Sequence, residues 1–148
     1  MSLSDTAEAA LLDLLFLNTD WANIGDAAGL QNSATAGSFY IALHTADPGD
    51  PGTQTTSECA YTGYARVAVA RSGSGFTRST STISNAALIQ FGACTAGPET
   101  ARYFSIGTAS SGTGSIVLSG ALTTELSITA SPSIQPQFAI GALTATAG

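Results

Sequence analysis

The spacing of hydrophobic residues changes once along the chain, from helical near the N-terminus to alternating over most of the remainder. Four apolar residues recur at the spacing of one helix face: Ala7, Leu11, Leu14 and Leu15. Residues 4–8 combine a capping residue with Glu8 placed three positions after Asp5, which is typical of a helix start. We therefore expect one short helix that ends near Asn18.

A loop of small and polar residues follows this helix. Trp21 is the expected anchor of the loop, and residues 31–38 form a polar linker before the first alternating segment. This change of pattern predicts two parts: a helix with a linker arm over residues 1–35, and a β-sandwich domain over residues 36–148.

The first alternating segment and the loop after it form the centre of the pattern. Three hydrophobic residues alternate with unlike neighbours: Phe39, Ile41 and Leu43. They predict a strand over residues 39–45. The prolines and glycines of residues 47–52 end that strand, and we expect the loop to reach about residue 60. Residues 61–70 are the predicted second strand.

Short alternating segments separated by turn signals fill the rest of the chain. The further predicted strands are residues 76–78, 80–84, 88–91, 102–107, 116–122, 125–129 and 134–143. Short strands with turn signals every ~8–12 residues are typical of an all-β fold. We predict an antiparallel β-sandwich, of jelly-roll or immunoglobulin-like type, with one short N-terminal helix. No repeat of fixed period is visible.

The charge content changes the functional picture. Charged residues make up 9% of the chain, against about 25% in an ordinary soluble domain. All four basic residues are arginine, lysine is absent, and the net charge is −6. Nucleic acid is not an expected partner, because phosphate binding needs clustered basic residues. The weakly charged surface either packs against other subunits or is simply uncharged.

Neither a membrane span nor a secretory signal is expected. The longest apolar run, residues 9–17, is interrupted by Asp13 and is far shorter than ~20 residues. The acidic N-terminus does not resemble a signal peptide, so we expect synthesis in a reducing cytosol. Cys59 and Cys94 are too few for a disulfide scaffold or a structural zinc site. They are ordinary thiols or, alternatively, form a bridge after release from the cell.

Candidate chemistry concentrates on the loop after the first strand. His44, Asp47 and Asp50 could form a metal site or an acid–base pair, but no second histidine completes a zinc set. The expected alternative is that His44 hydrogen-bonds the loop while the aspartates make turns. Residues 72–75 predict a turn and lack the context of a nucleophile elbow. We therefore expect no enzyme activity, and no catalytic, cofactor-binding or metal-binding residues.

Three tyrosines could stack on a sugar ring: Tyr61, Tyr64 and Tyr103. Packing in the core or against another subunit is the commoner use of such side chains. Both uses stay open at this point.

An ordered series of segments resembles a known family. The segments are residues 43–49, 52–54, 60–67, 83–87, 104–112 and 118–122. Together they are similar to small virion proteins of tailed bacteriophages, often labelled tail fibre or structural protein. The resemblance implies a non-enzymatic structural subunit that assembles in the host cytoplasm and resides in the virion, with no cofactor and no catalytic residues.

Within that family, the first hypothesis is a capsid decoration (cement) protein that stabilises the phage head through subunit contacts. The acidic N-terminal segment and the loop Asp47–Pro51 would make those contacts. The expected partners are other virion proteins and further copies of the chain, with a trimer suiting a three-fold axis. The alternative is a tail, neck, baseplate or tail-fibre component. A host-glycan module using Tyr61, Tyr64 or Trp21 is a further alternative.

Overall fold

The computed structural model describes residues 2–131 and 134–147, which divide into two compact units. The helix unit comprises Met1–Ser38, Ala70–Leu88 and Phe138–Gly148, and the sheet unit comprises Phe39–Val69 and Ile89–Gln137. Strands account for 38% of the structure and helix for 8%, and the sheets are antiparallel. The predicted all-β sandwich class with one short helix is therefore confirmed. The predicted boundary between residues 35 and 36 stays a prediction.

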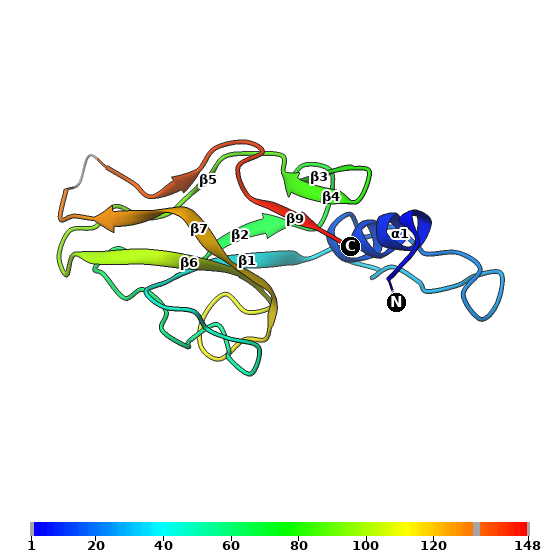
Figure 1. Ribbon diagram of the computed structural model, residues 1–148, viewed down its shortest axis with the longest axis horizontal. Coiled ribbons are helices and arrows are strands. Elements are labelled where there is room, and N and C mark those ends of the chain that lie inside the picture. The colour runs from blue at the N-terminus through cyan, green and yellow to red at the C-terminus, as the bar shows by residue number, and fades with distance from the viewer. Residues whose placement is uncertain (1, 132–133, 148) are drawn as a thin grey trace. The chain divides into compact units, whose positions relative to one another are not determined.

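The sheet unit is built on one four-stranded sheet with the order β2-β1-β6-β7 (Figure 1). Its strands are β1 (Ser38–His44), β2 (Val67–Ala70), β6 (Glu99–Gly107) and β7 (Ile116–Ile128). β1 and β6 pair antiparallel from Tyr40 opposite Gly107 to His44 opposite Tyr103. β5 (Ile89–Gln90) and β8 (Gln137–Phe138) form a separate two-stranded sheet.

Strand β1 is buried more completely than its alternation predicts. Phe39, Ile41 and Leu43 are buried as expected, but Ala42 and His44 between and after them are buried as well. A strand covered on both faces reads as a continuous rather than an alternating buried run. The polar His44 on this strand must therefore find hydrogen-bond partners inside the protein.

The predicted strand over residues 61–70 is wrong in its first half, since β2 begins only at Val67. Tyr61 and Tyr64 instead close a turn, in which the Tyr64 amide donates to the Tyr61 carbonyl at 3.0 Å. Gly63 in this turn has a φ of +105°, and a Cβ there would lie 2.1 Å from the Ala93 carbonyl oxygen. A close backbone approach of this kind requires glycine and ends the extended conformation.

The end of the chain also differs from the prediction. Residues 116–122 and 125–129 were expected as two strands, but β7 is one strand whose pairing with β6 shifts register between Ala101 and Tyr103. Such a bulge absorbs extra residues without ending the strand. The predicted strand over residues 134–143 is wrong over most of its length, because only β8 is a strand there and a turn containing Gly141 at a φ of +76° follows it.

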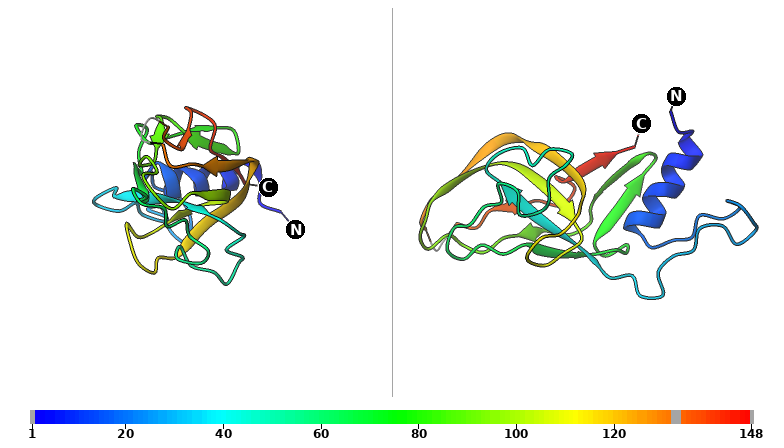
Figure 2. Two further views of the ribbon diagram at one scale, coloured as in Figure 1. Left: turned by 90° about the vertical axis from the view of Figure 1, so that its left-hand side faces the viewer. Right: turned by 90° about the horizontal axis from the view of Figure 1, so that it is seen from below.

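The helix unit combines α1 (Asp5–Phe16) with the sheet β3-β4-β9 (Figure 2). Its strands are β3 (Phe76–Ser79), β4 (Thr82–Asn85) and β9 (Thr144–Thr146). The Ser4 side chain caps α1 by accepting from the Ala7 amide at 3.3 Å. Arg71 binds the opposite end of the helix, donating to the carbonyls of Leu14 and Leu15. A cation at the helix C-terminus is favourable because the last carbonyls lack intrahelical partners.

The buried face of α1 is not the one predicted from the leucine spacing. Glu8, Leu12 and Phe16 are buried, one row along from the predicted face, whose four residues are only half-buried. The helix packs on β3 and β4 through this row. Phe16 meets Phe76 edge-to-face with ring centroids 5.0 Å apart, a favoured aromatic geometry. The large ring of Phe16 therefore determines which row faces the sheet.

Within residues 2–131 and 134–147, no helix has the length and apolar character needed to cross a membrane.

The first prediction concerns the core of the helix unit. Phe16→Ala should lower the free energy of unfolding by about 3–5 kcal/mol, because a fully buried ring leaves a cavity. Leu3→Ala is the matched control, since Leu3 is 48% exposed and its loss should cost less than about 0.5 kcal/mol. Urea unfolding followed by circular dichroism measures both. Equal effects of the two variants would contradict the assigned helix face.

Candidate functional site

A buried ion pair lies at the centre of the loops of the sheet unit. The Arg66 guanidinium donates two hydrogen bonds to Glu58, from Nε to Oε1 and from Nη2 to Oε2, both at 2.7 Å. The side chain of Arg66 is 2% exposed and that of Glu58 is 16% exposed. This two-point geometry is the strongest form of an arginine–carboxylate pair and fixes the orientation of both side chains.

The same guanidinium joins a second loop to the first. Arg66 also donates to the carbonyls of Ala109 and Gly112, at 2.9 and 2.8 Å. The loop that follows β1, residues 45–66, is thereby tied to residues 108–114, the connection between β6 and β7. We call these two segments the paired loops. They are held by specific polar contacts, although neither contains a helix or a strand of its own.

Gln54 fastens the paired loops a second time. It is fully buried, donates to the Tyr40 carbonyl at 3.1 Å, and accepts from the Ala109 amide at 2.9 Å. Gly107 and Gly114 pack directly against it, since a Cβ at either position would lie 2.1 or 2.2 Å from the Gln54 side chain. A side chain at position 107 or 114 would therefore clash with the Gln54 amide, so both positions require glycine. The sequence pattern did not predict a role for Gln54. The one indication was that Gln54 lies in residues 52–54, one of the segments that carry the family resemblance.

His44 behaves as the sequence predicts, by hydrogen-bonding the loop. Its Nδ1 lies 2.8 Å from the Thr56 carbonyl oxygen and its Nε2 lies 2.8 Å from Ser105 Oγ. Burial lowers the pKa of the imidazole below 6.5, against smaller raising effects from Thr56 and Glu58. Because both ring nitrogens are engaged and the residue is fully buried, the imidazole supports the loop.

The aspartates and thiols also have local roles. Asp47 Oδ1 accepts from the Gly49 amide at 2.9 Å, which confirms the predicted turn, and Asp50 is exposed. No cluster of three or more His, Cys, Asp or Glu suited to a metal ion occurs among the residues the structure covers. Cys59 and Cys94 are buried free thiols, and burial together with Glu99 raises the pKa of Cys59 to about 12. A thiol held in this neutral form is a poor nucleophile.

The tyrosines considered for sugar stacking divide into buried and half-buried groups. Tyr61 is 3% exposed and donates to the Gly92 carbonyl, which contradicts its use as an exposed platform. Tyr64 stacks on Phe91, accepts from the Leu43 amide and donates to Glu58. Tyr103 is half-buried on β6. Tyr64 is therefore linked directly to the ion pair through Glu58, and Tyr61 packs edge-to-face against Tyr64 with ring centroids 5.3 Å apart.

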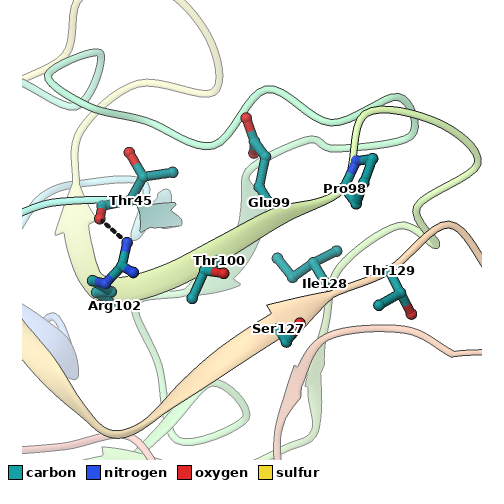
Figure 3. Close-up of a pocket in the computed structure, with 8 residues that line it drawn as sticks. All are labelled: Thr45, Pro98, Glu99, Thr100, Arg102, Ser127, Ile128 and Thr129. Carbon is teal, nitrogen blue, oxygen red and sulfur yellow. Dashed lines mark hydrogen bonds between the residues drawn. The ribbon is translucent and has the colours of Figure 1, made fainter.

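An open groove of about 350 Å³ lies where β6 begins and β7 ends (Figure 3). It is lined by Thr45, Pro98, Glu99, Thr100, Arg102, Ser127, Ile128 and Thr129. Arg102 donates to the Thr45 carbonyl at 3.2 Å and to Glu125 at 2.8 Å, and Glu99 accepts from the Ala60 amide at 2.9 Å. The groove can offer hydroxyl groups to a ligand, but its lining includes no aromatic ring, histidine or cysteine.

The second prediction follows from the burial of His44. The folded protein holds the imidazole at a lowered pKa, so between that value and 6.5 the unfolded chain binds more protons. The free energy of unfolding should therefore fall as the pH drops below about 6.5. The contribution of the neutral His44 should be fully present above that pH. Urea unfolding of the wild type and of His44→Gln at pH 7.5 and 5.5 measures the difference. The variant should lose less stability on acidification, and equal losses would contradict the account.

Comparison with known families agrees with the resemblance predicted from the sequence. A family model described as podophage GP4 fiber I protein gp80 matches residues 2–146. No curated protein matches the chain. The match confirms the predicted tailed-phage virion family and the predicted location in the virion. The chain therefore belongs to the podophage GP4 fiber I protein gp80 family and is a structural protein of a phage virion.

Proposed function

We propose that the protein is a tail-fibre component that acts through subunit contacts rather than through catalysis. The observation that carries this proposal is the family match, because its description names a fibre protein and it extends over residues 2–146. This was the alternative reading of the sequence. Capsid decoration, the first hypothesis, stays a prediction for which the family description gives no support.

The internal contacts suit a subunit with preformed surfaces. The paired loops are fixed by Arg66, Gln54 and His44, so they do not have to be ordered when a partner binds. A preorganised surface loses less conformational entropy on association than a flexible one. Association with other virion proteins is expected of the family, and the number of copies in an oligomer stays a prediction.

Glycan binding receives less support than assembly. The expected aromatic platform includes Tyr61, which is buried, and the groove of Figure 3 is lined by hydroxyl, charged and aliphatic side chains without an aromatic ring. Small-molecule sites are commonly lined by apolar and aromatic side chains with a few polar groups that fix the ligand. The groove is therefore better suited to a polar contact with another protein chain.

The third prediction tests the position in the particle. Cryo-electron microscopy of intact virions, with and without a bound Fab fragment raised against this protein, should place the added density on the tail or its fibres. A few to a few tens of copies per particle are expected there. Hundreds of copies distributed over the head would contradict the proposal and support capsid decoration. Particles lacking the gene serve as the control for Fab specificity.

A further inference from the structure

The segment between α1 and β1 is a structured loop. Its polar side chains bind its own backbone, while two of its large apolar side chains are exposed. We call residues 18–33 the N-terminal loop, which projects beyond α1 in Figure 2. Trp21 and Leu30 pair as an isolated antiparallel bridge with two backbone hydrogen bonds of 2.9 Å. Gly29 beside this bridge has a φ of +68°, and a Cβ there would lie 2.0 Å from the Trp21 carbonyl oxygen. The loop therefore has a defined backbone conformation.

The base of the loop is closed by amide side chains. Asn18 donates to the Ser33 carbonyl at 2.8 Å and accepts from the Ser33 amide at 2.9 Å. Asn32 donates in return to the Asn18 carbonyl at 3.0 Å. Asn18 has a φ of +53°, a conformation that asparagine tolerates better than most residues. These contacts hold the two ends of the loop together.

The acidic residues of the loop hold its backbone while remaining exposed. Asp20 Oδ1 accepts from the Asn32 amide at 2.6 Å. Asp26 Oδ1 accepts from the amides of Ala28 and Gly29 at 2.9 and 3.0 Å. Both aspartates are exposed, so each keeps its negative charge at the surface.

Two large apolar residues of the loop are exposed, and a third is half-buried. Ile24 is 39% exposed, Leu30 is 44% exposed, and Trp21 is half-buried. Trp21 and Leu30 face each other across the bridge, so their side chains lie on one side of it. In this loop the polar side chains hydrogen-bond to the loop backbone, and apolar side chains are exposed. A rigid loop of this kind has the properties of a preorganised contact surface.

The charge of the chain identifies the kind of partner. The chain has no lysine. Each arginine has a partner within the chain: Arg66 with Glu58, Arg71 with the end of α1, Arg78 with Asp13, and Arg102 with Glu125 in an exposed pair. A second copy could therefore meet Asp20 and Asp26 only by giving up one of these pairs within its own chain. A partner with basic residues around an apolar cleft would complement both features of the loop.

We propose that the N-terminal loop is the element by which this subunit docks on a different virion protein, in an apolar cleft edged by lysine or arginine. Trp21, Ile24 and Leu30 would enter the cleft, while Asp20 and Asp26 would face its basic edge. This inference rests on the proposed function, since it takes the protein to be assembled onto the particle. It extends that function by naming the contacting residues and the chemistry of the partner.

The fourth prediction uses particles purified from a phage lacking this gene as the probe, to which the purified protein is added. Wild-type protein should bind saturably. Ile24→Ser combined with Leu30→Ser should weaken binding by about tenfold or more, as loss of a central contact does. Leu88→Ser is the matched control, because Leu88 is 49% exposed in the same unit. Its binding should stay within about twofold of the wild type, since exposed residues outside a contact contribute little.

A second variant tests the charge. Asp20→Asn combined with Asp26→Asn keeps the acceptor oxygens that hold the loop and removes the two charges. Its binding should be weaker than wild type at low salt, and the difference should shrink in 0.5 M salt, where the Debye length is only ~4 Å. Circular dichroism and thermal unfolding establish that both loop variants remain folded.

Several outcomes would overturn the inference. One is that the Ile24/Leu30 variant binds the particles as tightly as the wild type does. Another is that the Leu88 variant loses as much affinity as the Ile24/Leu30 variant. The third is that the wild type does not bind the particles. A change from oligomer to monomer in the loop variant, measured by sedimentation, would assign the loop to a second copy instead. The Fab experiment locates the wild type independently of the loop. A head location therefore refutes the tail proposal alone, and unaffected variant binding refutes the docking loop alone.

Discussion

The sheet unit depends on the buried pair between Glu58 and Arg66. Removing two charges from water is costly, and the cost is offset only where the geometry is good and the remaining donors are satisfied. Here two hydrogen bonds of 2.7 Å join the pair, and Ala109 and Gly112 accept from the same guanidinium. The pair and these two carbonyl contacts together hold the paired loops in one arrangement, which the contacts of Gln54 and His44 also support.

The use of arginine connects this architecture to function. All four arginines have partners within the chain, and two of them hold the structure at defined points: Arg66 in its pair with Glu58, and Arg71 at the end of α1. The chain as a whole is weakly charged and acidic, which suits a virion structural protein that associates with other virion proteins. The paired loops are thus held by contacts within the chain, as the proposed function in assembly requires.

Local signals in the sequence predicted the helix cap, strand β1, the turn at Asp47 and the all-β class. Periodicity could not give contacts between distant segments, such as Arg66 with Gly112, which lie 46 positions apart. It also misplaced the second strand, because Tyr61 alternates like a strand residue but closes a turn. The family segments contained Gln54, Tyr64 and Arg66, yet their roles became visible only when the loops were brought together.

Hydrogen exchange of Glu58→Gln tests most directly whether the ion pair organises the paired loops. The account predicts faster exchange at the amides of Gln54 and Ala109, which are hydrogen-bonded within the paired loops, with little change in β3 and β4. Glu125→Gln is the control, since it removes an exposed partner of Arg102 and should leave those amides unchanged. Unaltered exchange at Gln54 and Ala109 in Glu58→Gln would contradict the account.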